Sequence, residues 1–243
     1  FPRKVRFPIA TSMSTRDTSS SEDPIIESRD QLVAPMAGGE KPKDAWRIGT
    51  EHEKLVYCRK TFKAPSYDEP GGIRDILLSL REFGWEPVEE GGKVIAMRGD
   101  DGTVSLEPAG QLELSGAPLE NLHETCAETG RHLDQVKQVG ERFGVGFLGL
   151  GMWPDKTRED LPIMPKGRYD IMLRHMPRVG SLGLDMMLRT CTIQVNLDYS
   201  SEADMAHKFR TSLALQPLAT ALFANSPFTE GKPNGYLSYR SHI

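Results

Sequence analysis

The sequence has few cysteines, no long uninterrupted apolar run and no marked excess of one charge. The three cysteines in 243 residues are Cys58, Cys126 and Cys191. They are too few and too scattered for a disulfide framework or a zinc site, and they indicate a reducing compartment, although one redox-sensitive pair stays open. The longest apolar stretch, residues 213–224, contains Gln216 and Pro217 and is too short to span a bilayer. We therefore expect a buried helix there.

The charge balance and the absent motifs argue against several function classes. The chain has 30 Lys and Arg residues against 34 Asp and Glu residues, a formal net charge of −4. Nothing in this balance favours a nucleic-acid or anionic-membrane partner. The sequence also lacks a G-x-x-x-x-G-K-[ST] phosphate loop, a complete G-x-G-x-x-G fingerprint and an H-E-x-x-H zinc motif.

Residues 1–44 differ in composition from the rest of the chain. They are rich in Ser, Asp, Glu, Lys and Pro, so we expect a flexible or weakly ordered segment in which residues 25–36 form a short docked piece. The first 16 residues are basic and rich in hydroxyl groups without an acid, as in an organelle transit peptide. A disordered tail, or a true start at Met13, explains the same composition. We expect a cytoplasmic protein, with a plastid location as the alternative.

From residue 45 to residue 243 the hydrophobic pattern becomes regular, and we expect the folded domain there. The pattern predicts helices at residues 71–83, 119–143, 167–176 and 202–224, and strands at residues 47–57, 93–97, 103–107, 111–115, 145–150 and 191–199. Gly84 and Gly144 are placed to cap helices at their C-termini. Ser201 is placed as an N-cap, and Pro217 should kink the helix that follows. The tight turns between strands favour an α+β fold with a largely antiparallel sheet.

The most informative strand is the last one, because its two faces differ in chemistry. Alternate side chains of a strand point to opposite faces. One face carries short hydrogen-bonding groups, namely Thr190, Thr192, Gln194, Asn196 and Asp198. The other face, with Cys191, Ile193, Val195, Leu197 and Tyr199, is typical of a core. A binding site and an ordinary solvent-facing strand explain the polar face equally well, and Cys191 is interpreted as a core residue rather than a nucleophile.

Two further segments place carboxylates on strand faces. In the first, residues 108–110 interrupt the strand and can bring Glu107 near Glu113, with Gln111 between them. The leucines of this segment, Leu106, Leu112 and Leu114, are predicted to face the core.

The second acidic segment is residues 49–53. Glu51 and Glu53 project from one face of the predicted strand, and His52 from the other. Neighbouring carboxylates repel unless a cation lies between them, and Mg²⁺ prefers carboxylate oxygens. The alternative is that both glutamates form ion pairs with Arg47 or Lys54 at the surface. Three polar strand faces in one chain favour a cleft that holds a metal ion.

A loop rich in Gly, Pro and Asn follows the last helix, at residues 225–240. Such loops often bind ligands. Within it, Lys232 and Arg240 can bind phosphate or carboxylate groups. The alternative is an ordinary surface loop whose charges are solvated.

These segments together resemble the plant- and proteobacterial-type glutamate–cysteine ligases. The blocks that carry the resemblance are residues 48–54 (IGTEHEK), 105–115 (SLEPAGQLELS), 164–169 (MPKGRY), 183–187 (GLDMM), 189–198 (RTCTIQVNLD) and 223–242. The resemblance covers about residues 46–243, as the N-terminal half of such a ligase. It implies a glutamine-synthetase-like fold with a curved, largely antiparallel sheet and flanking helices, incomplete in this fragment.

The resemblance also implies a reaction. ATP and Mg²⁺ would be the cofactors, and glutamate and cysteine the substrates, of the first step of glutathione biosynthesis. ATP would phosphorylate the γ-carboxylate of glutamate, and the amine of cysteine would then displace phosphate to give γ-glutamylcysteine. Two alternatives are a ligase of the same fold with another amine, and a non-catalytic remnant that binds glutamate or a nucleotide. A homodimer is left open.

Roles follow for individual residues by their places in the matching motifs. The metal ligands implied are Glu51, Glu53, Glu107 and Glu113. The cofactor contacts implied are Glu107, Gln111, Gln194, Asn196 and Lys232, and the groups that hold substrate carboxylate or phosphate are Arg189 and Arg240. In related ligases a metal-binding histidine falls near Gln194, so whether Gln194 itself contacts a metal ion stays open.

The sequence departs from the family pattern in a few positions. Residues 55–57, Ala109 and Leu112 replace common family residues but leave the carboxylates intact. Family members continue for about another domain, which would supply further sheet, nucleotide contacts and any disulfide partner of Cys126. We therefore expect this fragment alone to be inactive or nearly so.

Overall fold

The computed structural model describes residues 26–100 and 102–243, so the expectations for residues 1–25 lie outside the described residues. The helices are α1 (Arg29–Ala37), α2 (Ile73–Ser79), α3 (Leu122–Phe143), α4 (Gly167–Val179), α5 (Gly183–Arg189) and α6 (Glu202–Leu222), with 3₁₀ turns η1 (Lys43–Ala45), η2 (Leu80–Phe83) and η3 (Tyr239–Ser241). The strands are β1 (Ile48–Cys58), β2 (Glu86–Glu90), β3 (Lys93–Arg98), β4 (Thr103–Leu106), β5 (Leu112–Ser115), β6 (Val145–Leu148), β7 (Ile193–Leu197), β8 (Phe228–Thr229) and β9 (Lys232–Pro233).

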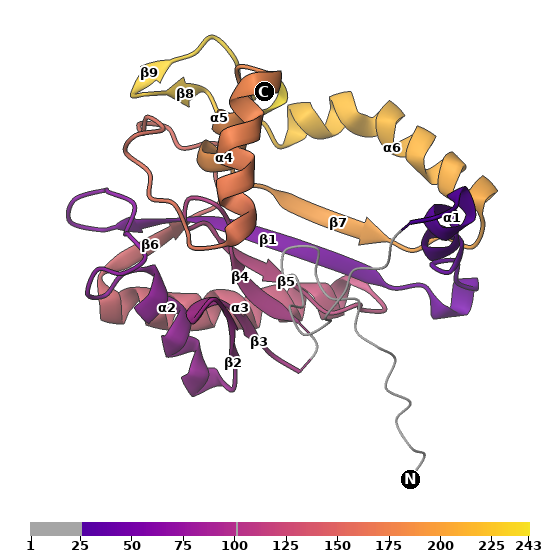
Figure 1. Ribbon diagram of the computed structural model, residues 1–243, viewed down its shortest axis with the longest axis horizontal. Coiled ribbons are helices and arrows are strands. Elements are labelled where there is room, and N and C mark those ends of the chain that lie inside the picture. The colour runs from indigo at the N-terminus through magenta and orange to yellow at the C-terminus, as the bar shows by residue number, and fades with distance from the viewer. Residues whose placement is uncertain (1–25, 101) are drawn as a thin grey trace.

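The long strand β1 is the centre of the fold. In the described chain a seven-stranded sheet runs in the order β2-β3-β4-β5-β1-β6, and β7 also pairs with β1. Each of these pairings is antiparallel. Figure 1 shows α2 and α3 on one side of the sheet and α4, α5 and α6 on the other. The predicted α+β class with a largely antiparallel sheet is confirmed.

The hydrophobic core lies where the sheet meets its helices. The buried side chains include Leu106, Leu112 and Leu114 from the sheet and Ile73, Ile76, Leu77, Val136 and Val139 from α2 and α3. Burying one such side chain stabilises the fold by about 1.5–3 kcal/mol. The three leucines therefore face the core, as their spacing predicts.

Most predicted elements are present with small shifts of their bounds. Gly84 and Gly144 end η2 and α3 in the left-handed conformation, and the Ser201 side chain accepts a hydrogen bond from the Asp204 N–H at the start of α6. Pro217 lies inside α6, which continues through it and arches in Figure 1. The pattern did not predict β2, α5 or the hairpin of β8 and β9.

Two predictions about burial are wrong. The apolar stretch at residues 213–224 was expected to be a buried helix, but α6 contains no buried residue. The apolar face of β7 was expected to face a core, but Ile193, Val195 and Leu197 are exposed. The physical reason is the same in both cases, because no described element packs over these side chains. No helix among residues 26–100 and 102–243 has the length and apolar character needed to cross a membrane.

The segment before β1 contacts the end of β7. Ser28 caps α1, in which no residue is buried. The Tyr199 hydroxyl donates a hydrogen bond to the Met36 carbonyl at 2.5 Å, and Lys41 forms an ion pair with Asp198 at 2.7 Å. The C-terminal end of α1 is therefore held against the β7 to α6 connection.

We predict opposite effects on stability from two glycine-to-alanine substitutions. A Cβ at Gly72, which precedes α2, would lie 2.3 Å from the Ser66 carbonyl oxygen. Because the backbone must move, Gly72→Ala should destabilise the fold by about 1–3 kcal/mol. A Cβ at Gly130, inside α3, meets no atom within 4 Å, so Gly130→Ala should stabilise by about 0.5–1 kcal/mol. Urea unfolding of both variants checks this, and equal effects would contradict the packing described at Gly72.

Candidate active site

Acidic and amide side chains share one face of the sheet around β1. The antiparallel register places Glu53 opposite Glu113 of β5, and Glu51 opposite Gln194 of β7. Asn196 stands opposite Gly49 on the same face. Directly opposed residues have Cβ atoms about 4.5–5.5 Å apart, and like charges in such positions destabilise a sheet. The structure therefore brings together residues from three strands that are distant in sequence.

The amide and backbone groups of β7 bind the carboxylates of β1. Gln194 Nε2 donates a hydrogen bond to Glu51, and Asn196 Nδ2 donates to Glu51 Oε1 at 3.1 Å. The Thr192 N–H donates to Glu53 Oε2 at 2.7 Å. Arg47 pairs instead with Glu120, and the Lys54 ammonium donates to the His52 carbonyl. The surface ion pairs weighed as the alternative for Glu51 and Glu53 are not among those of the described residues.

Glu107 joins this cluster through a turn between β4 and β5. Its N–H donates to the Gln111 carbonyl, and the Gly110 N–H donates to the Glu107 carbonyl, both at 2.9 Å. Gly110 has φ of +82°, a conformation that side chains other than glycine rarely adopt. The turn returns the chain so that Glu113 lies close enough to Glu107 to raise the pKa of that carboxyl. The predicted approach of these two carboxylates is confirmed.

Burial and mutual repulsion make Glu53, Glu107 and Glu113 weak acids. The pKa of Glu53 is raised to about 8, first by burial and then by the charges of Glu107 and Glu113. Burial also raises the pKa of Glu107 and of Glu113, and each is raised further by a neighbouring carboxylate. A group of acids in this state would be stabilised by added positive charge.

Basic side chains from outside the predicted strands reach the cluster. Arg168, in the first turn of α4, lies 3.4 Å from Glu107 Oε1. The buried Lys166, just before α4, acts on Glu107 and Glu113 and has its own pKa lowered to about 8 by burial. Neither was predicted as a site residue, because they lie in a loop and a helix start, where no alternation marks a face. Their motif, residues 164–169, was the available signal.

Arg240 is the second predicted arginine, and it lies close enough to Glu53 to lower the pKa of that carboxyl. Its backbone N–H donates to the hydroxyl of the buried Ser226 at 3.1 Å. The loop after α6 therefore returns to the carboxylate cluster.

Several predicted residues have other surroundings. The buried Gln111 uses its amide on the protein itself, accepting from the Ala109 N–H and donating to the Leu188 and Thr190 carbonyls. The Gln111 amide is therefore already hydrogen-bonded within the protein, and this gives no support to its predicted contact with a cofactor. Lys232 is exposed on β9.

His52 and Cys191 were interpreted as structural residues, and both have the surroundings expected of such residues. His52 lies on the opposite face of β1 from the carboxylates, where it pairs in register with Leu114 and Ile193. Cys191 is buried, which raises the pKa of its thiol to about 12.

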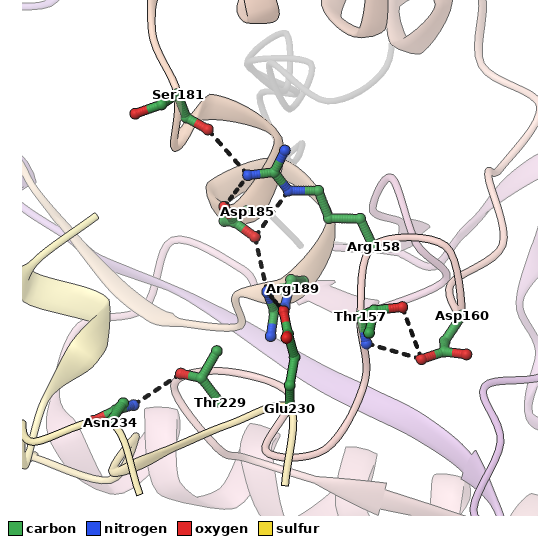
Figure 2. A network of polar contacts seen from close by, with 9 residues as sticks. All are labelled: Thr157, Arg158, Asp160, Ser181, Asp185, Arg189, Thr229, Glu230 and Asn234. Atoms are coloured by element: carbon green, nitrogen blue, oxygen red, sulfur yellow. Dashed lines mark hydrogen bonds and ion pairs between the residues drawn. The ribbon is translucent and has the colours of Figure 1, made fainter. Parts of the chain in front are cut away.

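Arg189, at the end of α5, lies in an ion network of its own. Its Nη1 donates to Asp185 at 3.0 Å and to Glu230 at 3.2 Å, and Arg158 binds the same aspartate (Figure 2). The Arg189 side chain is only 4% exposed. Its Nε and Nη2 have no hydrogen-bond partner within the described part of the chain. Arg189 also lines a cavity of about 320 Å³, together with Tyr239.

The donor set of the cluster fits a hard divalent cation. Glu51, Glu53, Glu107 and Glu113 supply carboxylate oxygens, the ligands that Mg²⁺ prefers. Burial and neighbouring carboxylates raise the pKa values of Glu53, Glu107 and Glu113, so added positive charge would stabilise their ionised forms. Within residues 26–100 and 102–243, no three such side chains already stand at the spacing that would hold a metal ion. The fit therefore lies in donor chemistry and charge, and not in a preformed coordination geometry.

Comparisons with known proteins give one consistent family. Residues 47–243 match the model of glutamate–cysteine ligase family 2. The chain is 59% identical to the chloroplastic glutamate–cysteine ligase of Brassica juncea over 97% of this chain and 45% of that protein. It is 59% identical to that of Arabidopsis thaliana and 58% identical to ligase A of Oryza sativa subsp. japonica, again over 97% of this chain. The chain spans less than half the length of these relatives.

We predict that the network at Arg189 is a main support of the fold. Asp185→Asn keeps the shape but leaves a buried arginine without its buried counter-ion, which should lower the free energy of unfolding by about 3–5 kcal/mol. Asp68→Asn removes exposed ion pairs with Arg74 and Lys93 and should change it by less than about 1 kcal/mol. Chemical unfolding of the two variants checks this, and similar losses would contradict it.

We predict that Glu53 makes a contribution to stability that is lost as pH rises in the absence of divalent cations. Glu53 has a pKa of about 8 in the folded chain, above the ordinary value of 4.5. The folded state therefore holds more protons than the unfolded state between these values, and stability is lost as pH rises through this window. Glu53→Gln should reduce the slope of melting temperature against pH between pH 5.5 and 8. Glu141→Gln, at an exposed position of α3, should leave it unchanged. An unaltered slope in Glu53→Gln would overturn the assignment of a raised pKa to Glu53.

Proposed function

Because this chain belongs to glutamate–cysteine ligase family 2, we propose that the complete protein joins the γ-carboxyl of glutamate to the amine of cysteine. The products are γ-glutamylcysteine, ADP and phosphate, in the first step of glutathione biosynthesis. The observation that carries the proposal is the family match over residues 47–243, which includes all four carboxylates of the cluster. The relatives' names place them in chloroplasts, so we propose the plastid rather than the cytoplasm as the location.

The carboxylate cluster is the proposed metal site. Glu51, Glu53, Glu107 and Glu113 would hold Mg²⁺, which when bound neutralises charge on the transferring phosphoryl group. Gln194 and Asn196 keep Glu51 oriented through their hydrogen bonds to it. The raised pKa values of Glu53 and Glu107 support this role, because a bound cation would stabilise the ionised form of each carboxyl.

Basic residues around the cluster are proposed to bind the anionic substrates. Arg240, beside Glu53, is placed to hold a substrate carboxylate or phosphate. Arg189 has two buried nitrogens without a hydrogen-bond partner among residues 26–100 and 102–243, and these suit a carboxylate or phosphate oxygen. Lys232 is proposed to contact the nucleotide from the hairpin of β8 and β9. Lys166 and Arg168 join them through their contacts with Glu107.

The reaction proposed is a two-step ligation. The γ-carboxylate oxygen of glutamate attacks the γ-phosphorus of ATP, and the bond to ADP breaks. The amine of cysteine then attacks the γ-carbonyl carbon, phosphate leaves, and the amine gives up a proton. The site would hold both reactants in position, and it would supply positive charges that stabilise the transferring phosphoryl group. We further propose that the complete domain has a curved, glutamine-synthetase-like sheet.

We predict that the activity needs both this chain and the part that its relatives have beyond it. A chimera of residues 1–243 followed by the remaining C-terminal part of the Brassica juncea relative should form γ-glutamylcysteine with ATP and Mg²⁺. Residues 1–243 alone should form none, since they span 45% of that relative. Product formation is measured by mass spectrometry. Product from the short chain would contradict the requirement for a second part.

The same chimera separates the alternative functions. A ligase with another acceptor would use a different amine from a panel in preference to cysteine. A non-catalytic remnant would bind glutamate in calorimetry but release no ADP.

We predict that Glu113→Gln in the chimera lowers kcat/KM by roughly 10²- to 10³-fold, the size typical of removing one group that stabilises charge in the transition state. Glutamine keeps the shape but removes the charge, and it loses a metal ligand. Glu141→Gln is the matched control and should retain activity. Circular dichroism shows whether both variants are folded. Unchanged turnover in folded Glu113→Gln would refute the site.

A further inference from the structure

The segment that begins α4 is tied to the turn that carries Glu107. The Met164 N–H donates a hydrogen bond to the Pro108 carbonyl at 2.9 Å. The buried Tyr169 donates its hydroxyl to the Leu106 carbonyl at 2.8 Å. Leu106 and Pro108 are the neighbours of Glu107 in the chain, so these two contacts bring the start of α4 beside the carboxylate cluster.

A third contact ties the same segment to the hairpin of β2 and β3. The Gly167 N–H, the first of α4, donates to Glu90 Oε1 at 2.8 Å. A Cβ at position 167 would lie 3.2 Å from this oxygen, so the glycine lets the carboxylate approach the backbone closely. Glu90 is the last residue of β2, and the turn that follows it has positive φ at both Gly91 and Gly92, as tight hairpin turns require. The tip of the hairpin therefore lies against the start of α4.

Glu90 supplies the N-terminal cap that α4 lacks in its own sequence. The first four N–H groups of a helix have no partner within the helix, and a side-chain oxygen of the N-cap residue commonly accepts from one of them. The N-cap residue of α4 is Lys166, whose side chain has donors only and cannot accept. A carboxylate is also favoured at this end by the helix dipole. Glu90, 77 residues away in the sequence, takes this role.

The residues on either side of Gly167 are the two basic residues that reach the carboxylate cluster. Arg168 Nη2 lies 3.4 Å from Glu107 Oε1. Burial lowers the pKa of Lys166, and the carboxylates of Glu107 and Glu90 act in the opposite direction, so this ammonium is near both. Because Arg168 follows the capped residue directly, any movement of the first turn of α4 would move its side chain away from Glu107.

We propose that Glu90 is a positioning residue, which by capping α4 holds Arg168 in the place from which it contacts Glu107 and binds an anionic group of a substrate. The binding of substrate by Arg168 rests on the proposed function, whereas the capping of α4 does not. A misplacement of about 1 Å in a group that orients a substrate can reduce activity by about 10²-fold. One hydrogen bond at the start of a helix is therefore enough to affect the reaction.

The cap is tested by hydrogen exchange in residues 1–243 without substrates. Glu90→Ala should speed the exchange of the amides of residues 167–172 roughly fivefold or more, the effect of losing one helix cap. The amides of α5 should be unaffected, which shows that the rest of the chain is folded. Glu90→Gln keeps an acceptor oxygen and should keep most of the protection. Glu86→Ala, at an exposed position of the same strand, is the matched control. Exchange at residues 167–172 that Glu90→Ala leaves unchanged would overturn the proposal.

The link from Glu90 to Arg168 is tested by urea unfolding of the same chain. Glu90→Ala and Arg168→Ala should each lower the urea midpoint. The shift in the double variant should be smaller than the sum of the two single shifts, because loss of the cap already releases Arg168 from Glu107. Shifts that add in full would show that Glu90 does not act on Arg168.

The effect on the reaction is tested by steady-state kinetics of the chimera. Arg168→Ala should raise the KM of the substrate that it binds, and Glu90→Ala should raise the KM of that same substrate by about 2- to 30-fold, the range that corresponds to one lost cap, with kcat nearly unchanged. Glu90→Gln, which keeps the acceptor but removes the charge near Lys166, should keep this KM close to that of the unaltered chimera.

Two kinetic results would contradict positioning through Arg168. One is an equal rise in the KM of every substrate or a fall in kcat alone, as a merely structural role would give. The other is a rise in KM from Glu90→Ala that is as large in the Arg168→Ala background as without it. A chimera that forms no γ-glutamylcysteine would count against the proposed function instead, and the exchange and unfolding experiments would still decide the role of Glu90.

Discussion

The pairing of β1 with its neighbours is the constraint on which the rest of the structure depends. Its N-terminal part lies between β5 and β7, and its C-terminal part pairs with β6. Because side chains alternate along a strand, this register places Glu51 and Glu53 on one face and His52 on the other. A shift of one residue would turn the carboxylates towards α3 and would place apolar side chains on the face that now carries the carboxylates. The buried leucines of β5 hold the register, since any slip would expose them.

The same register forces like charges together, and the surrounding residues only partly offset them. Glu53 stands opposite Glu113, and Glu107 is held close by the turn at Gly110. Lys166, Arg168 and Arg240 reduce the repulsion, yet burial and the neighbouring carboxylates keep the acid pKa values raised. The hydrophobic core thus sustains an arrangement that electrostatics alone would disperse. Raised acid pKa values of this kind are typical of functional sites, because like charges stay together only where the scaffold holds them.

The sequence predicted those features that depend on local periodicity. Alternation along two strands was enough to place Glu51 with Glu53 and Gln194 with Asn196, and the break at residues 108–110 was enough to bring Glu107 to Glu113. It did not predict Lys166 and Arg168, whose approach depends on where α4 packs. It also missed β2, whose sequence EPVEE carries a proline and three acids, because edge strands tolerate residues that propensity disfavours. The roles in catalysis came from the family resemblance and not from the pattern.

The wrong predictions of burial at β7 and α6 have one physical cause, and it also bears on the site. Both elements have the apolar composition of a core, so the pattern correctly describes what the side chains favour. What the pattern lacks is the covering element, which no part of residues 26–100 and 102–243 supplies. Gln194 and Asn196 lie on the same strand as the uncovered Ile193 and Val195, so the side chains that bind Glu51 border the uncovered region directly.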